Sequence, residues 1–245
     1  SSQSESEEIT MKMTKRIAAM VACAVMAASS MVGMGASAIT STNNIPYEEI
    51  STLSDTAPVG LISELHTVFN IPRYKQTGNT CWLECIRSIV NYKLGTTYSA
   101  DDIRTIMKES PTITPSSNGG LNQDNTVALL NRIFKKNSSA LKASLTKRPL
   151  SYAEIKKLID KDMPFILIAK NSATGAAHDV VVSGYATCWR DFGSYKTGDY
   201  TGLVLMNPQD GSEAFYYDSD TSDTAFSFTN YQNTTYDWYQ TIKIE

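Results

Sequence analysis

The stretch CWLECIRSIVNYKLG, residues 81–95, carries the strongest helical pattern of the chain. Its apolar residues recur at steps of three and four, which is the spacing of one face of an α-helix. A glycine at position 95 is typical of a helix end. The residues of the apolar face are Trp82, Cys85, Ile86, Ile89, Val90 and Tyr92. We therefore expect a helix that begins at Cys81 and buries this face.

Three more helices are expected after this one. Residues 99–102 (SADD) and 151–154 (SYAE) both read as capping boxes, in which a serine and an acidic residue satisfy the free N–H groups of a first helical turn. Residues 122–136 again have apolar side chains at helical spacing.

The pattern changes in the second half of the chain. Short apolar or alternating runs, separated by turn-rich segments, are typical of β-strands. These runs are residues 165–169, 179–185, 203–206 and 241–244. Helices followed by strands predict an α+β fold in which an N-terminal helical half packs on a C-terminal antiparallel sheet, rather than alternating βαβ units.

Residues 1–38 read as an N-terminal extension and a secretory signal peptide. A basic cluster at residues 11–16 precedes an uncharged run that ends in Ala36-Ser37-Ala38. This order predicts cleavage after Ala38 and a secreted or cell-surface protein. The alternative is a transmembrane anchor, for which the run is long enough. Contact with a membrane is expected only through an uncleaved signal peptide.

The remaining residues are enough for one domain with a substantial core. We expect residues 39–68 to be an N-terminal arm or a short propeptide, and residues 69–245 to be the main domain, which carries the candidate site residues given below. Lysine and arginine number 22 against 25 aspartates and glutamates, for a net charge of −3. No basic run indicates a nucleic-acid partner.

Export would leave an odd number of cysteines. Cys23 would depart with the signal peptide, and Cys81, Cys85 and Cys188 would remain. In an oxidising compartment, one of the three is then unpaired or reactive. A disulfide between Cys85 and Cys188 is one possibility that the sequence leaves open. The cysteine and histidine spacings match no zinc motif, so we expect neither a metal nor a cofactor.

Cys81 and His178 are the best candidates for a nucleophile and its base. A helix N-terminus carries a partial positive charge, so a cysteine at the helix start is expected to have a lowered thiol pKa. The chain has two histidines, and one of them, His66, falls in the expected arm. His178 leads directly into an apolar strand, where the ring can be held rigidly and still face a cleft.

Two kinds of helper complete the candidate site. Asn207 and Asp210 follow the strand at 203–206, and either side chain could accept a hydrogen bond from the imidazole and fix its tautomer. Gln76 lies in the loop before Cys81, where a side-chain amide could donate to the oxyanion that forms during attack. Asn-Pro and Asp-Gly are also ordinary turn formers.

Three segments resemble the catalytic blocks of papain-like cysteine peptidases, most closely the secreted bacterial branches of the staphopain or C39-like sort. They are QTGNTCW at 76–82, HDVVVSGY at 178–185 and MNP at 206–208. The resemblance covers about residues 70–210. It implies a papain-like fold in which the nucleophile helix packs on a β-rich half.

The resemblance also implies roles for individual residues. Cys81 would be the nucleophile, His178 the general base and then acid, Asn207 the orienter of the imidazole, and Gln76 the oxyanion donor. It further implies residues that pair with the backbone of a peptide substrate, namely Gly119 and Gly120.

The expected function is therefore a secreted cysteine endopeptidase whose partner is a protein or peptide substrate. Two alternatives remain. The same cysteine and histidine could serve an acyl transferase or amidase, of the transglutaminase-like or peptidoglycan-bridge kind. The chain could also be a non-catalytic surface module in which Cys81 is structural.

Overall fold

A computed structural model of the chain describes residues 60–191, 196–217, 226–230 and 234–245. The chain divides into residues 1–59 and a compact unit from Gly60 to Glu245, and only the second is described. The expected signal peptide and most of the expected arm lie outside the described residues. The compact unit begins earlier than residue 69, where we expected the domain to start.

Four helices form where the sequence predicted them. They are α3 (Cys81–Leu94), α4 (Ala100–Lys108), α5 (Gln123–Lys136) and α6 (Tyr152–Ile159). Both capping boxes are present, with Ser99 and Asp102 starting α4 and Ser151 and Glu154 starting α6. Gly95 ends α3 in the left-handed conformation, which glycine adopts without strain.

The strands form one antiparallel sheet of eight strands, with the order β2-β8-β3-β4-β5-β6, to which β1 is added beside β4 and β7 beside β8. Their bounds are β1 (Gly60–Thr67), β2 (Ala143–Thr146), β3 (Phe165–Asn171), β4 (Ala177–Asp191), β5 (Lys196–Asn207), β6 (Ser212–Tyr217), β7 (Ser227–Thr229) and β8 (Thr235–Ile244). The predicted strands correspond to β3, β4, β5 and β8. The described residues thus have the mixed α+β fold that we expected.

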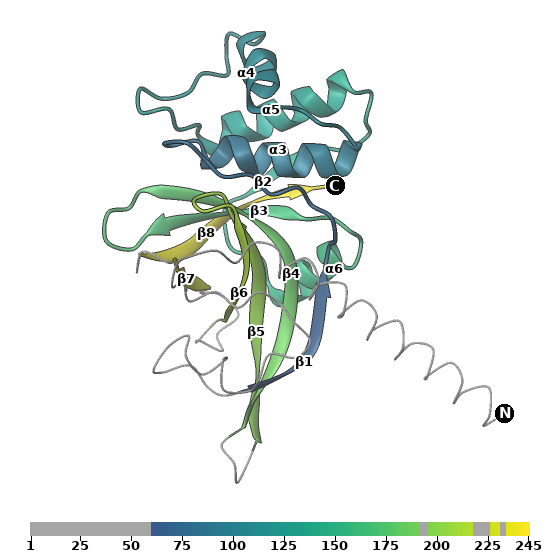
Figure 1. The fold of residues 1–245 in the computed structure, drawn as a ribbon, viewed down its shortest axis with the longest axis vertical. Coiled ribbons are helices and arrows are strands. Elements are labelled where there is room, and N and C mark those ends of the chain that lie inside the picture. Colours follow the sequence, from purple (N-terminus) through teal and green to yellow (C-terminus); the bar gives the residue numbers. More distant parts are fainter. Residues whose placement is uncertain (1–59, 192–195, 218–225, 231–233) are drawn as a thin grey trace, which may run out of the picture. The chain divides into compact units, whose positions relative to one another are not determined.

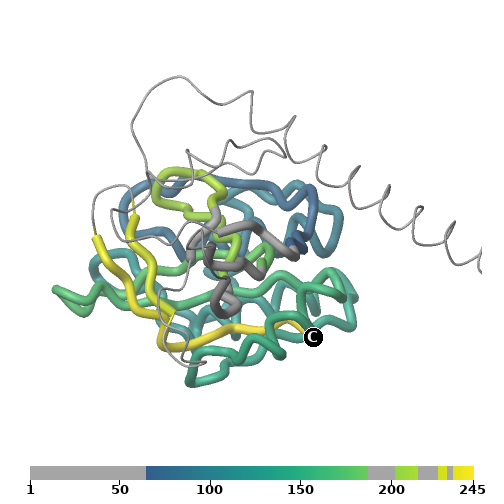
Figure 2. The backbone as a smooth tube through the Cα atoms, turned by 90° about the horizontal axis from the view of Figure 1, so that it is seen from below, coloured from purple at the N-terminus to yellow at the C-terminus, as the bar shows by residue number. Residues whose placement is uncertain are grey.

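Figure 1 shows α3, α4 and α5 together on one side of the sheet, with α3 closest to the strands. Contacts between α3 and β4 link the two layers. Figure 2, seen from below, shows the yellow C-terminal strand beside strands from the middle of the chain, because β8 pairs with both β2 and β3. The buried core is continuous from the apolar face of α3 to the inner strands β3 and β4.

The order of helices and strands differs from the expectation in two places, because β1 precedes the helices and β2 lies between α5 and α6. β1, which we expected to belong to the arm, pairs with residues 184–190 of β4, directly beyond the stretch of β4 that pairs with β3. Gly184 permits this close approach, since a Cβ there would lie 2.5 Å from the carbonyl oxygen of His66.

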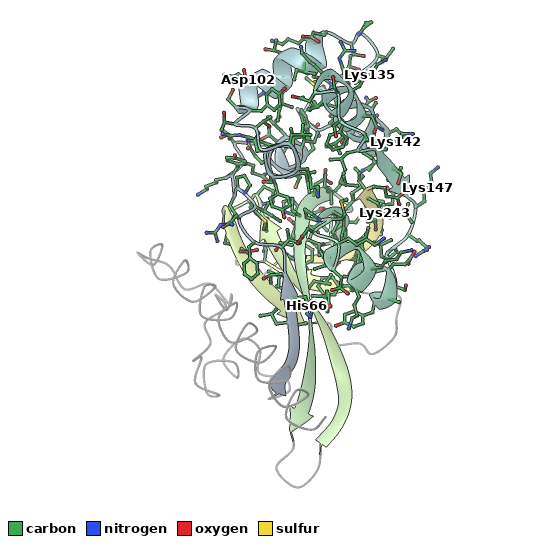
Figure 3. All side chains as sticks on the ribbon, turned by 90° about the vertical axis from the view of Figure 1, so that its right-hand side faces the viewer. His66, Asp102, Lys135, Lys142, Lys147 and Lys243 are labelled. Atoms are coloured by element: carbon green, nitrogen blue, oxygen red, sulfur yellow. The ribbon has the colours of Figure 1, made fainter. Side chains whose placement is uncertain are left out.

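His66 attaches β1 to α6 as well as to β4. Its ring stacks on Tyr185 at a centroid distance of 5.0 Å, and its Nδ1 lies 3.2 Å from a carboxylate oxygen of Asp160. The Tyr185 hydroxyl donates to the same oxygen at 2.8 Å. Figure 3 shows His66 on β1, well below the helical layer. His66 is therefore a structural residue of the sheet in this unit.

No helix in the described ranges is long and apolar enough to cross a membrane.

Candidate active site

Cys81 is the first residue of α3 and carries a free thiol. The residue before it, Thr80, occupies the N-cap position, but its side chain forms no capping hydrogen bond. The first-turn N–H groups of a helix have no partner within the helix, so they are available to a group at its N-terminus. In α3 the N–H groups of Leu83 and Glu84 already donate to the Thr80 carbonyl, at 3.0 and 3.2 Å, so those of Cys81 and Trp82 are left for a group at this end of the helix.

The thiol of Cys81 lies against the start of β4. Backbone N–H groups of Asp179, Trp82 and Cys81 itself interact with the sulfur. Asp179 follows His178 directly, and both belong to β4. The fold therefore brings the candidate nucleophile to the residue beside the candidate base, although the two are far apart in the sequence.

His178 and Asn207 are joined by a short, buried hydrogen bond. His178 Nε2 lies 2.8 Å from Asn207 Oδ1, and both residues are buried. The backbone N–H of Gln209 donates to the same Oδ1 at 3.0 Å, so this atom must be the amide oxygen. An oxygen cannot donate, so Nε2 carries the hydrogen and Nδ1 is the unprotonated nitrogen that can accept a proton.

Asp210 is not bonded to the imidazole. One of its carboxylate oxygens accepts from the backbone N–H of Ser212 at 2.8 Å and from the Ser212 hydroxyl at 2.7 Å. Its negative charge still acts on His178 through space and raises the pKa of the ring. Of the two orienters that we considered, Asn207 is the one in contact.

Tyr236 packs on the imidazole, and the sequence analysis did not identify it. Its ring centroid lies 5.1 Å from that of His178, at an interplanar angle of 39°. The Phe228 ring in turn stacks on the Tyr236 ring, at a centroid distance of 5.4 Å. The alternating apolar residues of β8 were a signal for a strand, but nothing local indicated that this strand would cover the histidine.

The loop before Cys81 is attached to the loop that carries Asn207. Gln76 N donates to the carbonyl of Pro208 at 2.7 Å, and a Cβ on Gly211 would lie 3.3 Å from the Lys75 side chain. The three segments that resemble papain-like catalytic blocks, residues 76–82, 178–185 and 206–208, thus lie together in the fold.

The side chain of Gln76 is engaged within its own loop. Its Nε2 donates to the carbonyl of Gly78 at 2.7 Å, while its Oε1 is buried and has no hydrogen-bond partner among the residues that the structure describes. An amide nitrogen has two hydrogens, so one remains for another acceptor. The role of Gln76 as oxyanion donor stays a prediction.

The glycine pair lies beside the nucleophile helix. Trp82 Nε1 donates to the carbonyl of Gly119 at 3.0 Å, and Asn79 Nδ2 donates to the carbonyl of Asn118 at 3.1 Å. Gly119 has φ +85°, a conformation that favours glycine.

The backbone groups of both glycines are already bonded inside the protein. Gly119 N donates to Ser116 O at 2.9 Å, and Gly120 N donates to Asn118 Oδ1 at 3.1 Å. Gly120 O accepts from Ser116 N at 2.8 Å. The Ser116 hydroxyl also donates to Gly120 O, at 2.9 Å. Pairing of this loop with a substrate backbone stays a prediction, and would use the remaining lone pair of the Gly119 carbonyl.

The electrostatics of Cys81 differ from the expectation of a lowered pKa. Burial, and secondly the negative charge of Asp179, raise the pKa of the thiol to about 12. The backbone donors described above lower it, but by less. Burial also lowers the pKa of His178, against the opposing effects of Asn207 and Asp210. Near neutral pH, the resting pair is a neutral thiol and a neutral imidazole.

Cys85, one turn further along α3, is also a free thiol and is fully buried. The side chain of Cys188 lies outside the described residues. Within the described ranges, no three histidine, cysteine, aspartate or glutamate side chains are grouped so that they could hold a metal ion.

Comparisons with known proteins identify no family. No protein-family model matches the chain. No curated protein matches its sequence at a significant level.

Proposed function

We propose that the chain is a secreted cysteine endopeptidase of the papain-like kind, with Cys81 as nucleophile and His178 as base. The observation that carries the proposal is the ordered contact of three distant segments. The Cys81 sulfur meets the backbone next to His178, and the ring of His178 is held by Asn207.

The proposed mechanism starts from neutral groups. As the Cys81 sulfur attacks the peptide carbonyl carbon, the thiol proton passes to Nδ1 of His178, and the carbonyl oxygen becomes an oxyanion. The C–N bond then breaks, and the leaving amine takes the proton from Nδ1. A water molecule hydrolyses the resulting thioester, with the imidazole again accepting a proton.

Asn207 and Tyr236 hold the imidazole through these steps. The Asn207 oxygen stabilises the ring in the tautomer with a free Nδ1 and favours the imidazolium that forms during attack. Tyr236 limits ring rotation on the other side and reduces access of water. We expect the backbone N–H of Cys81 to donate to the developing oxyanion, with the Gln76 amide as a further candidate donor.

The proposal is tested with a fluorogenic peptide library and an epoxysuccinyl probe that labels active thiols. We expect the wild-type protein to cleave peptides and to take up the probe on Cys81. Cys81→Ser and His178→Ala should reduce cleavage to background. Cys85→Ala, which removes the neighbouring buried thiol, is the matched control and should retain cleavage.

Two outcomes would overturn the proposal. Cleavage that survives Cys81→Ser would exclude this cysteine as nucleophile. Transfer of the acyl group to an added amine, in strong preference to water, would replace hydrolysis by acyl transfer at the same site.

A further inference from the structure

Tyr74 attaches the loop between β1 and α3 to the body of α3, and the proposed mechanism does not use it. The guanidinium carbon of Arg87 lies 3.6 Å from the centroid of the Tyr74 ring, and Asn91 Nδ2 donates to the Tyr74 hydroxyl at 2.9 Å. A cation this close to a ring face is attracted by it. Arg87 and Asn91 are four residues apart and therefore neighbours on the surface of α3, so both contacts hold one side chain against the same stretch of the helix.

Both partners of Tyr74 are themselves held in place. Asn91 is 4% exposed, and its Oδ1 accepts from the backbone N–H of Tyr98 at 2.7 Å. Arg87 Nε donates to the Tyr98 carbonyl at 3.0 Å, and Arg87 Nη1 lies 3.4 Å from a carboxylate oxygen of the buried Glu84. These bonds leave the two partners little freedom, so Tyr74 rests on a rigid part of α3.

Two residues beyond Tyr74, the same loop is bonded to the loop that holds the imidazole. Gln76 N donates to the carbonyl of Pro208 at 2.7 Å. Pro208 directly follows Asn207, whose side-chain oxygen lies 2.8 Å from His178 Nε2. Tyr74 thus belongs to a short chain of contacts that runs from the nucleophile helix to the residue that orients the base.

The two neighbours of Tyr74 contact the sheet side instead of α3. Arg73 Nη1 lies 3.9 Å from a carboxylate oxygen of Glu213 on β6, and a Cβ on Gly211 would lie 3.3 Å from that of Lys75. Within the described part of the chain, Tyr74 is therefore the residue of this three-residue stretch whose side chain is bonded to α3.

We propose that Tyr74 is a positioning residue that sets the alignment of the His178 imidazole with Cys81. The inference rests on the proposed function of this cysteine and histidine. Without the Tyr74 ring, the loop can shift along α3 and carry Pro208 and Asn207 with it. Transfer of the thiol proton to the imidazole depends steeply on the alignment of the two groups. The core between α3 and β4 does not include Tyr74, so the fold should persist when the ring is removed.

The test is steady-state cleavage of a fluorogenic peptide by two variants of Tyr74. Tyr74→Leu removes both the ring and the hydroxyl, whereas Tyr74→Phe keeps the ring beneath Arg87. We expect kcat to fall about tenfold in Tyr74→Leu and about threefold in Tyr74→Phe, with KM nearly unchanged. Urea midpoints of the same samples establish that both variants are folded in the assay, and Tyr74→Phe takes the place of Tyr74→Leu if the latter is not.

A double-mutant cycle with Asn207→Ala separates alignment from a general loss of stability. In the Asn207→Ala background the imidazole has already lost its orienting acceptor, so Tyr74→Leu should lower kcat by less than about twofold. An equal loss in both backgrounds would overturn the inference, because independent effects add. Tyr92→Leu removes another partly buried tyrosine ring of α3 and is the matched control. It should retain the wild-type kcat, and a loss as large as that of Tyr74→Leu would also overturn the inference.

Alkylation of Cys81 by iodoacetamide at pH 7 gives the same comparison without a peptide, since the imidazole can take the thiol proton in this reaction too. We expect slower alkylation in Tyr74→Leu than in the wild type, with Cys85 unlabelled in both. Equal alkylation rates and equal kcat values would refute the role of Tyr74. Absent cleavage by the wild type, with the difference in alkylation still present, would instead refute the proposed peptidase function alone.

Discussion

Replacing Asp179 with Asn should make the protein more stable above neutral pH and leave its stability unchanged near pH 4. The folded state raises the pKa of this carboxyl from 3.8 to about 7. Between these values, the folded protein binds the proton more tightly than the unfolded chain does. The stability that the proton provides is therefore complete below pH 4 and is lost as pH rises to about 7.

The size of the effect follows from the same shift. About three pKa units at about 1.4 kcal/mol each give a loss of about 4 kcal/mol for the wild type at pH 8. Asn does not titrate, so the variant avoids this loss. Since many domains have only about 5–15 kcal/mol of stability in total, the difference should be plain.

The assay is urea denaturation at pH 4, 5, 6, 7 and 8, followed by tryptophan fluorescence. Both proteins should carry Cys81→Ser, which prevents self-cleavage and removes the titration of that thiol. The lowered pKa of His178 affects both proteins equally. A difference in unfolding free energy that is the same at every pH would refute the reasoning, since it would show that no buried charge at residue 179 is being relieved.

Three further predictions concern the site and the sheet. Asn207→Ala should lower kcat about 100-fold with a smaller change in KM, because the imidazole loses its orienting acceptor; an unchanged kcat in steady-state assays would exclude that role. Gly184→Ala should lower the urea midpoint by the equivalent of about 1–3 kcal/mol, since its Cβ would meet the His66 carbonyl at 2.5 Å; equal midpoints would contradict the tight β1–β4 approach. Trp82→Phe should raise KM about fivefold, an effect of about 1 kcal/mol, because the bond to Gly119 at 3.0 Å holds the adjacent loop; a change confined to kcat would point to a different function of this loop.

The helices were predictable because their signals are local. Within residues 81–95, the helical spacing of apolar residues predicts α3 and Gly95 marks its end. The four-residue capping boxes that begin at Ser99 and Ser151 mark the starts of α4 and α6. The inner strands are also continuous apolar runs. β1 and β2 gave no comparable signal, because they are short or partly polar and are strands only through their pairing with β4 and β8.

The sequence indicated residues for the candidate site but not their electrostatics. Cys81, His178 and Asn207 stood out from motif and order, and the contact between the last two is present. A helix start alone predicted a lowered pKa for Cys81. The pKa of Cys81 is instead raised by burial and by the negative charge of Asp179. Asp179 lies close to Cys81 only because β4 packs on α3. Tyr236 was missed for the same reason.

The bond between Gln76 N and Pro208 O has a consequence for how the protein folds. It connects the loop before α3 with the end of β5, so it can form only after most of the chain has been assembled. The pairing of β2 with β8 spans a similar distance along the sequence. Contacts of such large sequence separation form slowly compared with helices. A newly synthesised chain should therefore have its α3 thiol in a helix well before it has an aligned imidazole, and the proposed peptidase activity would appear only when folding is nearly complete.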